Sequence, residues 1–90
     1  MTNVVHRGKH HFDVFIGRPS KWGNPFSHTG FGAIRVSTRE EAIHRYEQWV
    51  RSQPHLMASI KRELRGKTLG CYCKPLPCHG DVLARIAEEP

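Results

Sequence analysis

The three cysteines of the chain lie within one short segment, GCYCKPLPCHGD, which also carries a histidine and an aspartate. Thiolates and imidazoles are ligands that zinc prefers, so a tetrahedral ion could be held by Cys71, Cys73, Cys78 and His79. Three thiolates with an open position could also hold an iron–sulfur cluster. The spacing C-x-C-x4-C-H matches neither the C-x2-C pairs of ordinary zinc modules nor the ferredoxin pattern, so any metal site would be an unusual one.

The same segment could instead supply a reactive thiol. If Cys78 opens a helix, the unpaired N–H groups and the helix dipole there would stabilise its thiolate. His79 could then act as a general acid or base, with Asp81 orienting it or placing a charge at the helix start. A third interpretation also stays open, in which the cysteines are small buried hydrophobic residues. The catalytic candidates are thus Cys78, His79 and Asp81.

A second segment with binding chemistry is the loop GRPSKWGNPF, residues 17–26. Its two cations could bind a phosphate, and the tryptophan beside them could stack a base. The alternative is that the aromatic residues cap the core and that the Gly-Asn-Pro step is the turn that allows it. The residues predicted to bind a ligand are Arg18, Lys21, Trp22, Asn24 and, from the cysteine segment, Lys74.

Composition limits what these segments can belong to. Ninety residues predict a single domain over positions 1–90, and 14 Lys and Arg against 8 Asp and Glu give a formal charge of +6 that favours an anionic partner. No long apolar run indicates a membrane span, and the N-terminal residues do not resemble a secretory signal. Three crowded cysteines make a poor disulfide framework. We therefore expect a cytoplasmic protein, in the host cytoplasm if a phage encodes it, with no membrane partner.

The elements that would position these residues follow from periodicity and turn chemistry. Residues 4–7 and 12–17 read as two strands, with a hairpin as one option. Three helices are expected at 38–52, 55–65 and 80–88, the first opening with a capping box between Ser37 and Glu40. A buried strand is expected at 68–73, so that Cys71 and Cys73 project to the same side. The predicted fold is a small α/β domain with a short, parallel-containing sheet, flanking helices and a site at the C-terminal end of that last strand.

The chain resembles a small family of bacteria and their phages, catalogued as domain of unknown function 4326. The likeness lies in FIGRPSKWGNPF, EEAIHRYEQWV and LRGKTLGCYCKPLPCHGDVL, in that order, and covers well over half of the chain. The last stretch also resembles a more distant group in which a strand ending in cysteine leads to a Cys-His pair that opens a helix. The family implies no established activity. It implies that the two segments belong to one signature, which favours a shared pocket.

Together these features predict a protein with a Cys/His site that binds or acts on an anionic nucleotide-like or nucleic-acid ligand. A bound zinc is the first cofactor option, an iron–sulfur cluster the second, and no cofactor the third. Two alternatives are a non-enzymatic, zinc-stabilised nucleic-acid-binding module and a phage-type effector that binds a host protein. The sequence leaves open whether the protein is an enzyme and which oligomeric state it has.

Overall fold

The last strand of the chain lies at the centre of the main sheet. The computed structural model describes residues 1–18, 20–28 and 34–90. In it, β5 (Thr68–Cys71) pairs in parallel with β1 (Asn3–His6) on one side and with β2 (Val14–Phe15) on the other. A separate parallel pair joins β3 (Phe26–Ser27) to β4 (Ile34–Arg35). The prediction of a parallel-containing α/β fold is therefore confirmed.

The hairpin option for the first two strands is wrong. In the described residues β1 and β2 are not neighbours, because β5 separates them and both run parallel to it. Val4 lies opposite Leu69, and Val14 lies opposite the same residue from the other side. The apolar segment at 68–71 forms backbone hydrogen bonds along both of its edges, with β1 on one side and with β2 on the other. A hairpin would instead have paired β1 and β2 directly with each other.

The helices begin and end where local chemistry dictates. They are α1 (Arg39–Arg51), α2 (Pro54–Glu63) and α3 (His79–Glu88). The N-cap of α1 is Thr38, whose Oγ1 accepts the Glu41 N–H at 3.0 Å, while Glu41 Oε1 accepts the Ser37 N–H at 3.0 Å. The predicted cap at Ser37 with Glu40 is thus displaced by one residue to Thr38 and Glu41, and the Glu41 carboxylate accepts from Ser37 and not from the N-cap residue itself. Gly66 follows α2 with a φ of 77°, a conformation that favours glycine.

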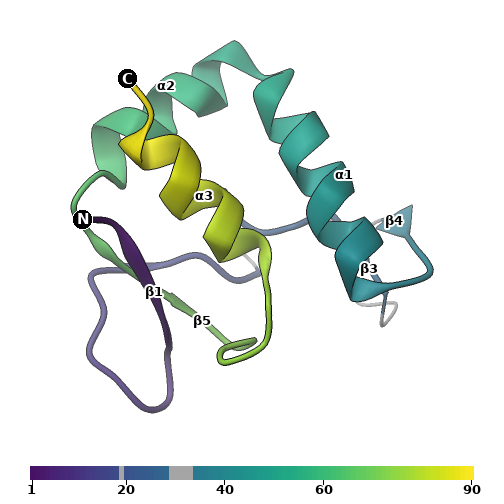
Figure 1. Ribbon diagram of the computed structural model, residues 1–90, viewed down its shortest axis with the longest axis horizontal. Coiled ribbons are helices and arrows are strands. Elements are labelled where there is room, and N and C mark those ends of the chain that lie inside the picture. The colour runs from purple at the N-terminus through teal and green to yellow at the C-terminus, as the bar shows by residue number, and fades with distance from the viewer. Residues whose placement is uncertain (19, 29–33) are drawn as a thin grey trace.

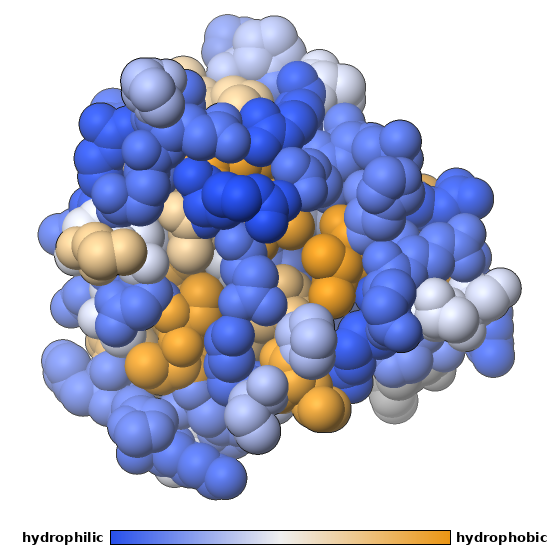
Figure 2. All heavy atoms as spheres, viewed as in Figure 1, coloured by the Kyte–Doolittle hydropathy of each residue, from blue (hydrophilic) through white to orange (hydrophobic). Residues whose placement is uncertain are grey.

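The helices and the sheet enclose one hydrophobic core. The three helices gather in the upper part of the view in Figure 1, and α3 packs against both β1 and β5. Figure 2 shows that this face is mostly hydrophilic, with small groups of hydrophobic residues between the polar ones. Among the described residues, no helix is long and apolar enough to cross a membrane. The largest fully buried side chains of the core, Cys71 apart, are Ile16, Tyr46, Val50, Ile60, Leu64, Leu69, Val82, Leu83 and Ile86.

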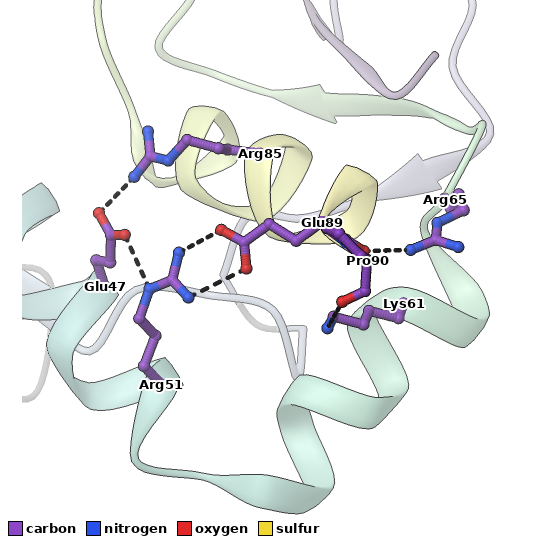
Figure 3. Close-up of polar contacts among 7 residues, drawn as sticks. All are labelled: Glu47, Arg51, Lys61, Arg65, Arg85, Glu89 and Pro90. Carbon is purple, nitrogen blue, oxygen red and sulfur yellow. Dashed lines mark hydrogen bonds and ion pairs between the residues drawn. The ribbon is translucent and has the colours of Figure 1, made fainter.

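Ion pairs join α1 to the end of α3, and hydrogen bonds to backbone carbonyls join the end of α2 to the same region (Figure 3). Arg51 on α1 binds the Glu89 carboxylate after α3 with an Nη2–Oε2 distance of 2.6 Å, and Glu47 on α1 bonds Arg85 on α3. Arg65 donates from Nε to the Ala87 carbonyl at 2.6 Å, which satisfies an otherwise unpaired carbonyl at the end of α3. These contacts keep α3 in the position from which its N-terminus reaches the cysteine segment.

Candidate functional site

The three cysteine sulfurs gather where β5 ends and α3 begins. Cys71 is the last residue of β5 and Cys78 is the N-cap of α3, and their Sγ atoms lie 3.4 Å apart. Cys73 belongs to the same cluster, because both of the other thiols shift its pKa. Cys71 and Cys78 are buried, whereas Cys73 is half-buried. The most accessible sulfur of the three is therefore that of Cys73.

Two thiols of this cluster have pKa values that shift in opposite directions. Hydrogen bonds from Cys71 and Cys78, helped by nearby Arg39, lower the pKa of the Cys73 thiol well below its usual range, although burial opposes them. For Cys78 the hydrogen bonds with Cys71 and Cys73, together with burial, raise the pKa. The two shifts belong to one coupled system, and their directions favour Cys73 over Cys78 as the site of the negative charge.

His79 is a neutral side chain fixed against the sheet. Its Nε2 lies 2.7 Å from the carbonyl oxygen of Ile16, and its ring packs edge-on against Tyr46 with centroids 5.1 Å apart. Because a carbonyl can only accept, Nε2 carries the proton and Nδ1 is the unprotonated nitrogen. Burial lowers the pKa of His79, which keeps the ring uncharged at neutral pH.

Asp81 and Lys74 close the cysteine loop. Lys74 Nζ lies 2.7 Å from Asp81 Oδ1, and Asp81 Oδ2 accepts the Cys78 N–H at 3.1 Å. The carboxylate thus joins the loop to the first turn of α3, where a negative charge is also favourable to the helix dipole. His79 bonds with the Ile16 carbonyl, whereas Asp81 bonds with Lys74 and with the Cys78 N–H. Of the two expected roles of Asp81, these contacts fit the charge at the helix start.

A cavity of about 250 Å³ joins the cysteine segment to the loop at 17–28, and we call it the shared pocket. The start of α1 forms its third wall. Of the predicted site residues, six line it: Arg18, Asn24, Cys71, Cys73, Cys78 and His79. The other lining residues are Gly17, Phe26, Ser27, His28, Arg39, Ala42, Ile43, Tyr72 and Pro77. The two segments of the signature therefore meet at one cavity.

The chain belongs to the family Domain of unknown function (DUF4326). That family matches residues 3–89, which include both walls of the shared pocket. The chain is also 38% identical over 92 aligned positions to the "Uncharacterized 12.4 kDa protein in nrdA-td intergenic region" of Enterobacteria phage T4, covering 99% of this chain and 80% of that protein. No solved structure matches the chain.

In this DUF4326 chain, hydrogen bonds within the loop and from the loop to α1 fix the side of the loop that faces the pocket. Arg18 Nη1 donates to the Asn24 carbonyl at 2.7 Å. Asn24 Oδ1 accepts the Phe26 N–H at 2.8 Å, and its Nδ2 donates to the Ala42 carbonyl at 3.2 Å, which fixes the loop to α1. These hydrogen bonds therefore fix the position of Arg18 at the pocket.

Two predicted ligand residues of the same loop lie elsewhere. Lys21 Nζ pairs with the Glu63 carboxylate at 2.9 Å and lies 4.7 Å from the centre of the Trp22 ring. Trp22 is only 4% exposed and belongs to the hydrophobic core, and its carbonyl accepts the Tyr46 hydroxyl at 2.7 Å. Neither lines the shared pocket, so their contribution is to hold the loop on α1 and α2.

Arg39 is the second cation of the pocket, and it was not among the residues predicted from the sequence. Arg39 Nη1 donates to the Pro77 carbonyl at 3.3 Å, and its charge helps to lower the pKa of Cys73. A signal was present, because Arg39 is the first residue of α1, where the helix dipole disfavours a cation. A cation in that position points to a nearby anion outside the helix.

The metal hypothesis gains no support from the arrangement of side chains. Across residues 1–18, 20–28 and 34–90, no group of three or more His, Cys, Asp or Glu side chains is arranged to hold a metal ion. The Nε2 atom of His79 is already engaged by a carbonyl. A zinc or iron–sulfur site therefore stays a prediction from the types of residue in this segment.

Proposed function

We propose that the protein binds a small anionic, nucleotide-like molecule in the shared pocket and acts on it through Cys73 as a nucleophile. The observation that carries this proposal is that one cavity contains an accessible sulfur together with two arginines from different elements, Arg18 and Arg39. Guanidinium groups bind phosphate and carboxylate oxygens well, because their N–H donors match the geometry of these anions. The thiolate is the form of cysteine that attacks an electrophile.

The size and lining of the pocket favour a small ligand. Its volume of about 250 Å³ is close to the lower end of the usual range for small-molecule sites, about 300–1,000 Å³. Phe26 and Ile43 give it an apolar wall, while Asn24 and the arginines give it polar groups. A mixed lining of this kind suits a molecule with a flat ring at one end and an anionic group at the other.

The proposal names Cys73 rather than Cys78, the thiol favoured by its place at a helix start. Cys78 is 2% exposed, and its hydrogen bonds with Cys71 and Cys73, together with burial, raise the pKa of its thiol. The N-terminal end of α3 nevertheless contributes to the site, because Cys78 is one of the two thiols that lower the pKa of Cys73.

Alkylation kinetics with peptide mass spectrometry test the nucleophile. At about pH 6 an ordinary thiol with a pKa near 8.5 is almost wholly protonated, whereas Cys73 should react with iodoacetamide and Cys78 should not. Arg39→Gln should slow this reaction, because it removes the cation beside the thiolate. The matched control is Arg62→Gln, which removes the same charge from an exposed position on α2. Faster labelling of Cys78 than of Cys73 would contradict the proposal.

Ligand binding is tested by protection. Adenosine and thymidine monophosphates, with inorganic phosphate as a comparison, should slow alkylation of Cys73 in the wild-type protein and protect less in Arg18→Gln. If neither nucleotide protects Cys73 at any concentration, the ligand class is wrong. Elemental analysis of the same sample separates the zinc alternative: one zinc per chain would overturn the nucleophile, because a metal-bound sulfur is not free to attack.

A further inference from the structure

A second feature lies on the face of the sheet opposite the helical core. Side chains alternate along a strand, so Leu69 and Cys71 point into the core while Gly70 and Tyr72 project from the other face. The ring of Phe12 covers Gly70 so closely that a Cβ there would lie 2.6 Å from it. Phe15, opposite Gly70 in the register, meets Tyr72 edge-on with ring centroids 5.7 Å apart.

One arginine binds these three rings together. The Arg7 guanidinium carbon lies 4.9 Å from the centre of the Phe15 ring, 5.3 Å from that of Tyr72 and 5.9 Å from that of Phe12. Arg7 Nη1 also donates to the Tyr72 hydroxyl at 2.9 Å. Tyr72 is 60% exposed despite these contacts, so its ring is held in place yet open to solvent. We call Arg7, Phe12, Phe15 and Tyr72 the aromatic face.

Charge is distributed unevenly between this part of the chain and the helices. The first 35 residues contain five Lys and Arg but a single carboxylate, Asp13, whose Oδ2 accepts the Thr68 N–H. The turn that contains Arg7 continues with three exposed basic residues: Lys9, His10 and His11. Glutamates of the helices are held in ion pairs, among them Glu41–Arg45, Glu47–Arg51 and Glu89–Arg51. The aromatic face is therefore bordered by positive charge.

We infer that the aromatic face binds single-stranded nucleic acid. Tyr72 is an exposed ring that its neighbours hold in place, and cations lie next to it. Proteins bind single strands with this combination, because bases stack on the ring and phosphates bind the cations. A duplex keeps its base faces inside the stack and offers Tyr72 nothing to contact. Tyr72 also lines the shared pocket, so a strand lying on the aromatic face would reach the pocket mouth. The inference goes beyond the proposed function, since the face could bind a strand whether or not Cys73 is a nucleophile.

Fluorescence anisotropy with a labelled oligodeoxythymidylate of about 12 nucleotides tests the inference. Tyr72→Ala should weaken binding about 5- to 150-fold, the usual effect of losing one stacked base, while Tyr72→Phe should retain most of the affinity. Arg7→Gln should weaken binding and reduce its salt dependence. Arg62→Gln is the matched control, because it removes one charge from α2, and it should change the affinity far less than Arg7→Gln does.

Three results would overturn the inference. These are equal affinity for the single strand and the corresponding duplex, equal weakening by Arg7→Gln and Arg62→Gln, and unchanged affinity in a folded Tyr72→Ala protein. If Tyr72→Ala proves unstable by circular dichroism, the pair Arg7→Gln and Arg62→Gln decides by itself. The measurement contains no thiol chemistry, so a failure of nucleotide protection at Cys73 leaves it standing, and its own failure leaves the alkylation test standing.

Discussion

At the scale of single residues, the pocket depends on groups whose charge state is set by burial and by neighbours. His79 is the clearest example, because it is fixed between Ile16 and Tyr46 and burial lowers its pKa. Cys73 and Asp81 oppose that shift and Arg18 adds to it, but burial is the largest cause. The folded protein therefore needs a neutral ring, whereas the unfolded chain accepts a proton at an ordinary pKa.

This difference predicts a loss of stability in mild acid. As the pH falls below about 6.5 the unfolded state binds a proton that folded His79 rejects, so the free energy of unfolding decreases by up to about 1.4 kcal/mol per pH unit. The Cys73 thiolate contributes a slope of the same sign, since its folded pKa is also lowered. Urea unfolding between about pH 5 and 7 should therefore show a shallower slope in His79→Gln than in wild type. His44→Gln, an exposed position on α1, should keep the wild-type slope. Parallel slopes in all three proteins would contradict the assignment.

At the scale of elements, the start of α1 sets the position of Arg39 in the pocket. Thr38→Ala removes the side-chain oxygen that accepts the Glu41 N–H, and the free energy of unfolding should fall by about 1 kcal/mol. Ser37→Ala should have little effect, because Ser37 contributes its backbone N–H to Glu41. Thermal denaturation of the two variants distinguishes the caps: a larger loss in Ser37→Ala would restore the sequence-based expectation.

Local signals allowed the helices to be predicted but not the pairing of strands. Pro54 and Gly66 mark the limits of α2 through their own backbone preferences, so the expected and observed bounds differ by one or two residues. The neighbours of β1 depend instead on contacts with residues more than sixty positions away, which no local pattern encodes. The same holds for the site. The short loop from Cys71 to Cys78 made their proximity foreseeable, whereas Arg39 reaches Cys73 only through the packing of α1.

At the scale of the whole molecule, the two ends of the chain are joined by hydrogen bonds. The Thr2 hydroxyl lies 2.6 Å from Glu88 Oε2 and accepts the Gly66 N–H at 2.9 Å. Thr2 is 7% exposed, so the hydroxyl that makes these bonds lies largely inside the protein. A single side chain thus links the start of β1, the segment after α2 and the end of α3.

Thr2→Val tests this junction, because valine has nearly the same shape and no hydroxyl. It leaves the Gly66 N–H without its acceptor, and we expect a loss of about 1–3 kcal/mol in the free energy of unfolding by urea. Asn3→Ala changes the next, exposed residue of the same strand and should be close to neutral. If the Thr2→Val protein is as stable as wild type, the hydrogen bonds of the Thr2 hydroxyl contribute nothing to the free energy of unfolding.

The central place of β5 also has a consequence for synthesis on the ribosome. Both described neighbours of β5 precede it by more than fifty residues, and each pairs with residues 68–71. The emerging chain therefore carries β1 and β2 with their sheet partner still untranslated. The wall of the shared pocket that holds the cysteines follows later still. The main sheet and the shared pocket are thus completed only once β5 and the residues after it have been synthesised, and a chain that stops before β5 would have neither.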